Sequence, residues 1–152
     1  MLENITKQDL NKTVWVKPAY LKDNRKWYII DATDQTLGKL AVKVANILTG
    51  KNKAHVCDFW DCGDYVIIEN IDKIKVTWNK LADKMYRTHS GYKGHLKEIS
   101  LSRMLATHPE RVIISAVRWM LPKNKLRDPR IKRMKLFVGT TNKYDNLSPE
   151  RI

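Results

Sequence analysis

The chain has 152 residues, of which 29 are Lys or Arg and 16 are Asp or Glu, so its formal net charge is +13. This charge favours nucleic acid or an anionic membrane surface as the partner, rather than an acidic metabolite. Hydrophobic residues make up 43% of the chain, which is enough for one folded domain and argues against global disorder. No apolar run approaches the roughly 20 residues that a membrane span requires, so nucleic acid is the favoured partner.

Hydrophobic patterning begins at Trp27. Residues 1–26 show little periodicity and mix lysines with acids, which predicts an uncleaved N-terminal extension rather than a transit peptide. Aromatic and β-branched residues predict a strand over 27–31. Apolar residues at helical spacing then predict a helix over 37–48, with Gly50 in the position that follows its C-terminus. Asp34 or Thr36 can cap its start.

The middle of the chain alternates further strand and helix signals. Strands are expected over 66–70, where β-branched residues run continuously, and over 74–77. Residues 84–88 read as another strand that pairs nearby. Helices are expected over 100–107 and 110–120, the second with a capping box from Thr107 to Glu110. Alternation of this kind predicts an α/β fold, a small mostly parallel sheet between helices in three layers. We place this single domain at 27–139 and a polar tail, loose or wrapped around a partner, at 140–152.

Residues 116–139 contain the densest charge in the chain. An apolar helix ends at Leu121-Pro122, because proline cannot continue it. Seven cations follow with Asp128 as the only acid, and a short apolar strand at 136–138 leads to Gly139. The pattern predicts an exposed cationic loop between two buried anchors, suited to a phosphate backbone. A merely solvated charged surface is the alternative.

Several motifs resemble the L-thirteen family of large-subunit ribosomal proteins. They are Asp31-Ala32 with the run T-L-G-K-L-A at 36–41, D-C-G-D-Y at 61–65, a His-Ser-Gly loop at 89–91, and M-L-P-K at 120–123 followed by a basic turn. The resemblance covers roughly residues 27–144. It implies an rRNA-binding structural protein of the large subunit that helps assembly, with rRNA and neighbouring ribosomal proteins as partners. The variants of the motifs at 61–65 and 120–127 resemble those of the mitochondrial branch of the family. This resemblance implies that the protein is located in the mitochondrial matrix, and a bacterial cytoplasm is the alternative location.

The candidate RNA-binding residues are basic, histidine and tyrosine side chains on the predicted surface elements. Lysines and arginines would meet phosphates, while Tyr92 and the histidines could stack on bases. The candidates are Lys39, Lys43, Lys51, Lys53, His55, Lys80, His89, Tyr92, Lys93, Arg118, Lys123, Lys125, Arg127, Arg130, Lys132, Arg133 and Lys135. Gly38 would weaken its helix by about 1 kcal/mol relative to alanine. There are two explanations for a glycine at this position: another segment or RNA approaches the backbone closely there, or the helix simply tolerates the loss.

Two tryptophans, Trp78 and Trp119, stand where the family normally has glycine. Glycine at such positions usually answers a need for positive φ or close packing. One explanation is that the indoles are packed in a new way, for example against a neighbouring protein. The other is that both positions are encoded by a reassigned UGA codon, which the cell reads as glycine and the written sequence gives as tryptophan. The intact mass of the native protein decides between them.

Catalytic and metal-binding signatures are absent from the sequence. The opening strand-helix unit lacks the G-x-G-x-x-G of dinucleotide sites, and no phosphate-binding loop motif is present. His55, Cys57 and Cys62 supply at most three zinc ligands, whereas a structural zinc site needs four. Two cysteines are also too few for a disulfide scaffold. We therefore expect no enzyme, metal, cofactor or small-molecule substrate. A free-standing RNA-binding regulator is the alternative function.

Overall fold

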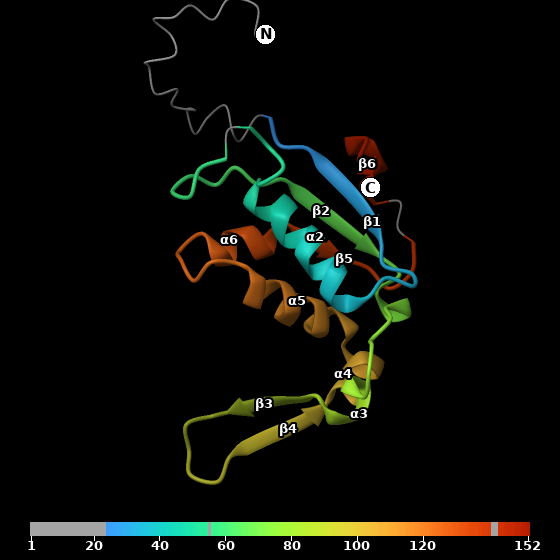
Figure 1. Cartoon of the computed structure of the whole chain (residues 1–152), viewed down its shortest axis with the longest axis vertical. Helices are drawn as coiled ribbons and strands as arrows, with labels where there is room; N and C mark the ends of the chain where they lie inside the picture. Colours follow the sequence, from blue (N-terminus) through green and yellow to red (C-terminus); the bar gives the residue numbers. More distant parts are fainter. Residues whose placement is uncertain (1–23, 55, 141–142) are drawn as a thin grey trace, which may run out of the picture.

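The computed structural model describes residues 24–54, 56–140 and 143–152 (Figure 1). Its main sheet has four strands in the order β5-β2-β1-β6, and each neighbouring pair is parallel. The strands are β1 (Trp27–Asp31), β2 (Tyr65–Glu69), β5 (Met134–Leu136) and β6 (Glu150–Arg151). β1 and β2 form the centre of the sheet, with all five residues of each in register from Trp27↔Tyr65 to Asp31↔Glu69.

Three helices accompany this sheet: α2 (Leu37–Thr49), α5 (Pro109–Met120) and α6 (Arg127–Lys132). α2 is followed by Gly50, whose φ is +80° and whose N–H donates to the carbonyls of Asn46 and Ile47. The strand predicted over 27–31 and the helix predicted over 37–48, with Gly50 after it, are confirmed.

The core lies between the helices and one face of the sheet. Tyr28 and Ile30 of β1, and Val66 and Ile68 of β2, pack in one cluster with apolar residues of α2 and α5. The residues that alternate with them, Ile29 and Ile67, lie on the opposite face and are also buried. Both faces of the central strands are thus covered. The structure confirms a single α/β domain with a mostly parallel sheet.

A hairpin extends from this body (Figure 1). It consists of β3 (Met85–His89) and β4 (Leu96–Ser100), which pair antiparallel. Its base joins α3 (Lys80–Asp83) and α4 (Leu101–Thr107), where Leu101, Met104 and Val112 of α5 form a second, smaller core. We call residues 85–100 the hairpin arm. The strand expected over 84–88 is confirmed, and β4 is its partner.

Three local expectations are wrong. Residues 74–77 form no strand and contribute only an isolated parallel bridge from Lys75 to Thr36. The helix after Thr107 has no side-chain cap, because the Thr107 hydroxyl donates to the Arg103 carbonyl instead. Part of the polar tail is ordered against the sheet, since β6 follows η3 (Asp145–Leu147) and pairs with β1.

A second 3-10 turn, η2 (Ile71–Lys73), follows β2. None of the helices in the described ranges has the length and apolar character needed to cross a membrane.

Candidate nucleic-acid interface

The cationic run after α5 divides into an outer and an inner set. Helix α6 occupies the middle of what the sequence suggested is a loop. Lys123, Lys125 and Lys132 are exposed, whereas Arg130 and Arg133 are 2% and 5% exposed. The expectation that the whole run faces solvent is therefore wrong for these two arginines. The exposed lysines 123, 125 and 132 are named the outer lysines below.

Arg130 and Arg133 point inward because a carboxylate meets them there. Arg133 Nη2 donates to Asp61 Oδ1 at 2.7 Å, and its Nη1 contacts Oδ2 of the same group. Arg130 Nε lies 3.4 Å from Asp61 Oδ1, and Arg25 Nη2 lies 3.2 Å from Oδ2. Burial alone raises the pKa of Asp61, but the hydrogen bond and charge of Arg133, with the charges of Arg25 and Arg130, outweigh burial and lower that pKa below its usual value. We call these four residues the Asp61 cluster.

The rest of the 61–65 motif is structural as well. A Cβ on Gly63 would lie 1.9 Å from the Leu48 carbonyl oxygen, so only glycine lets this loop pass the end of α2. Asp64 is buried, and its Oδ1 accepts bonds from Lys53 Nζ at 2.5 Å and from the backbone N–H of Lys26 at 3.0 Å. Lys53, a predicted RNA contact, is thus held within the protein. Cys57 and Cys62 form no disulfide, and burial raises the pKa of the Cys62 thiol.

The other candidate RNA-binding residues differ in how accessible their side chains are to RNA. Arg127 is half-buried and donates to the carbonyls of Leu121 and Pro122 at 3.2 and 3.3 Å. Arg118 forms an exposed ion pair with Asp128 at 3.4 Å. Lys135 lies half-buried in β5. Lys51 is exposed in the turn after α2, and His55 lies outside the described residues.

The hairpin arm carries the predicted loop at its tip. His89 Nδ1 accepts a bond from the N–H of Gly91 at 3.0 Å, and Gly91 and Gly94 both have positive φ. Tyr92 is 75% exposed, with its ring 6.0 Å from that of His95. Lys93 is exposed beside it. The tip therefore presents an aromatic side chain and a cation with no body of protein behind them, an arrangement suited to unpaired bases and phosphate.

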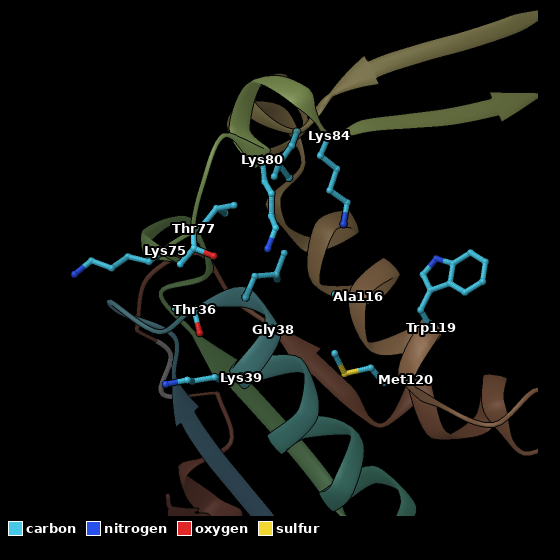
Figure 2. A pocket seen from close by; sticks show the side chains of 13 residues that line it. Thr36, Gly38, Lys39, Lys75, Thr77, Lys80, Lys84, Ala116, Trp119 and Met120 are labelled. Carbon is cyan, nitrogen blue, oxygen red and sulfur yellow. The ribbon is translucent and has the colours of Figure 1, made fainter.

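A groove between the start of α2, α3 and the end of α5 gathers further lysines. Its volume is about 710 Å³, and Lys39 and Lys80, both predicted, line it together with Lys75 and Lys84, which were not. Figure 2 shows Lys80 and Lys84 extending from the α3 region over the start of α2 and over α5. The spacing of four between Lys80 and Lys84 was the signal that could have identified Lys84. Lys43 lies on α2 beside this groove and is half-buried.

The two unusual tryptophans are both on the surface. Trp78 is 88% exposed and Trp119 is 76% exposed, so neither indole is packed into the core of this chain. Trp78 has φ of +63°, the left-handed region that glycine adopts without strain. Trp119 lies in the last turn of α5, where Lys123 Nζ is 5.7 Å from its ring centroid.

Comparison with known proteins identifies the family. The family described as Ribosomal protein L13 matches residues 25–143. Large ribosomal subunit protein uL13 of Nitratidesulfovibrio vulgaris is 46% identical over 129 residues, covering 85% of this chain and 90% of that protein. The protein of the same name from Francisella tularensis subsp. holarctica is 46% identical over 139 residues, with 91% and 96% covered. That of Pelobacter propionicus is 48% identical over 126 residues, with 83% and 89% covered. These relatives are bacterial and give no support to a mitochondrial branch. The chain belongs to the ribosomal protein L13 family.

Proposed function

We propose that this chain is a structural component of the large ribosomal subunit that binds rRNA and supports subunit assembly. The observation that carries the proposal is the extent of the family match, because residues 25–143 include the hairpin arm and every element of the α/β body except η3 and β6. The relatives named above are themselves large ribosomal subunit proteins and cover most of this chain at 46–48% identity.

Three separate basic surfaces support this function: the groove, the outer lysines and the tip of the hairpin arm. Exposed lysines on them would neutralise phosphates and displace counterions, so binding should depend mainly on RNA shape and backbone. The available candidates are Lys39, Lys43, Lys51, Lys80, His89, Tyr92, Lys93, Lys123, Lys125 and Lys132. Neighbouring ribosomal proteins are further partners, and the proposal assigns no reaction, cofactor or small-molecule substrate.

A bacterial ribosome is the location that the comparisons favour. The relatives named above come from bacteria, and the motif forms at 61–65 and 120–127 suggested mitochondria only by resemblance. A bacterial cytoplasm, the alternative from the sequence, fits these relatives.

Sedimentation tests the function directly. A lysate of the source cells is run through a sucrose gradient at moderate and at high salt, and the protein is followed with an antibody. We expect it to run with large subunits and to resist the salt wash, because many phosphate contacts act together. A protein that stays at the top of the gradient at both salts contradicts the proposal and favours the free-standing RNA-binding regulator.

A further inference from the structure

We propose that the groove between α2, α3 and α5 receives an unstacked nucleotide of the bound RNA. The base would lie on the apolar floor of the groove, and the adjoining phosphates would meet Lys80 and Lys84. This inference rests on the proposed rRNA-binding function. It names one site at which the protein would prefer single-stranded RNA to base-paired RNA.

The groove has the size and floor that a base requires. Its volume of about 710 Å³ lies within the range of small-molecule pockets. Apolar side chains from four different segments meet in it: Leu37 of α2, Val76 of the loop before α3, Leu101 of α4, and Ala116 and Met120 of α5. Met120 is 42% exposed, so part of this apolar surface is open to a flat ligand.

The charges around the floor all have one sign. Four lysines line the groove, and no acidic residue does. Lys75 pairs with Asp34 at 2.9 Å and points away from the floor in Figure 2. Lys39, Lys80 and Lys84 form no ion pair with any residue in the described part of the chain, although Lys84 Nζ lies 5.5 Å from the ring centroid of Tyr86. These three ammonium groups are therefore available to an anion.

The start of α2 adds to this positive potential. The first N–H groups of a helix have no partner within it, and its N-terminal end carries partial positive charge. Thr36 makes no side-chain capping bond, and the first turn of α2 contains no acid that would neutralise that end. A Cβ built on Gly38, which lines the groove, meets nothing within 4 Å. Outside its own helix backbone and chain neighbours, no described atom lies within 4 Å of that Cβ, so the space directly above Gly38 is open to a ligand.

RNA explains this combination better than an acidic peptide does. A nucleotide joins a flat, largely apolar base to phosphates on both sides of it, which matches an apolar floor with ammonium groups above it. The chain's net charge of +13 also attracts a polyanion over long range.

The open space at Gly38 makes a sharp test possible. Gly38→Leu fills the groove from a position where the added side chain meets no described atom within 4 Å at its Cβ, and Gly38→Ala is the matched control. The full chain is titrated with a fluorescent single-stranded oligouridine and with a base-paired RNA hairpin of equal length. We expect Gly38→Leu to weaken oligouridine binding about tenfold or more and to leave hairpin binding unchanged. Gly38→Ala should change either affinity much less.

A second variant tests the phosphate contacts without filling the groove. Lys80→Ala with Lys84→Ala should weaken oligouridine binding and reduce its salt slope by up to about two units. Both residues are exposed, so circular dichroism and Tm should show an intact fold. Lys123→Ala with Lys125→Ala removes the same charge from the outer lysines, and it should weaken binding of oligouridine and of the hairpin alike, whereas Lys80→Ala with Lys84→Ala should weaken oligouridine binding more.

The outcomes separate the groove from the wider function. Equal oligouridine affinity for Gly38→Leu and the unaltered chain overturns the inference, while co-sedimentation with large subunits would still support the proposed function. Tight binding of a polyglutamate peptide, lost in Gly38→Leu, would assign the groove to an acidic protein segment and also overturn it. If the unaltered chain binds neither RNA and fails to co-sediment, the proposed function itself is wrong.

Discussion

At the scale of single residues, Trp78 has a backbone that does not suit its side chain. Among the described residues, three others besides glycine have positive φ, namely Asp34, Asn70 and Ser148, and their side chains are small and polar. Asp and Asn tolerate this region, whereas a bulky residue there is an outlier. The indole is 88% exposed, so little burial offsets the strain. For Trp78, glycine in the native protein is the explanation that this backbone favours.

Two substitutions at position 78 separate backbone strain from the loss of the indole. Trp78→Gly removes both the side chain and the steric cost of positive φ, while Trp78→Ala removes the indole but keeps a Cβ. We expect Trp78→Gly to be more stable than Trp78→Ala by about 1 kcal/mol, measured by urea unfolding. Equal stabilities would show that the left-handed conformation is not maintained in solution.

At the scale of elements, the segment from Lys123 to Arg133 combines two functions that its composition does not distinguish. The outer lysines face solvent, while Arg130 and Arg133 belong to the Asp61 cluster and attach α6 to the loop before β2. A long cationic side chain can serve either purpose, and its environment decides which.

Alanine substitutions of the outer lysines and of the two buried arginines should have opposite effects on RNA binding and on stability. Replacing the outer lysines with alanine should weaken binding to a large-subunit rRNA transcript and lower its salt slope by up to about three units. Thermal stability should change little, because exposed charges contribute little to it. Replacing Arg130 and Arg133 with alanine should instead cost about 3 kcal/mol or more, since Asp61 keeps its charge but loses two of its partners.

Anisotropy titrations and thermal unfolding of both variants measure these effects. Stability lost in the lysine variant, or kept in the arginine variant, would show that this division between outer and inner charges is wrong.

At the scale of the whole molecule, the Asp61 cluster connects parts that are distant in sequence. Asp61 is separated by 36 residues from Arg25, by 69 from Arg130 and by 72 from Arg133. One carboxylate thus joins the start of β1, the loop before β2 and the entry to β5. The strands it connects are the three that form most of the parallel sheet.

Acid should therefore unfold the protein partly through Asp61. Its pKa is lower in the folded state than in the unfolded chain, so its contribution is fully present above the unfolded value of roughly 3.9 and is lost as pH falls through the folded value. Asp61→Asn should cost about 3 kcal/mol at neutral pH. It should also lose less further stability than the unaltered protein as pH falls below about 4. Urea unfolding from pH 3 to 7 measures both, and parallel pH profiles would exclude this role.

Residue content and periodicity were sufficient to predict the main elements of the body. β1 was predicted from its aromatic and β-branched residues, and α2 from apolar residues that recur at helical spacing. Arg130 and Arg133 could not be placed, because a charge run has no period that separates inward from outward side chains. β6 could not be predicted either, since Glu150 and Arg151 join the sheet through backbone bonds that leave no hydrophobic pattern.

The candidate site was predictable as chemistry but not as geometry. Lys39 and Lys80 were each identified as cations on surface elements, yet only the tertiary fold places them on one groove with Lys84. Asp61 was noticed as part of a family motif, and its role in binding three arginines became evident only from the structure.

The hairpin arm also affects the order of events in assembly. Tyr86 and Ile99 pack at the base of the arm against the small core around Leu101, whereas the tip has no such support. An isolated two-stranded ribbon is only marginally stable in water. We therefore expect the tip to open and close locally in the free protein and to become ordered on contact with RNA. The body can dock first as a rigid unit. We expect the arm to become ordered in a later, slower step, which requires the surrounding RNA to be folded already.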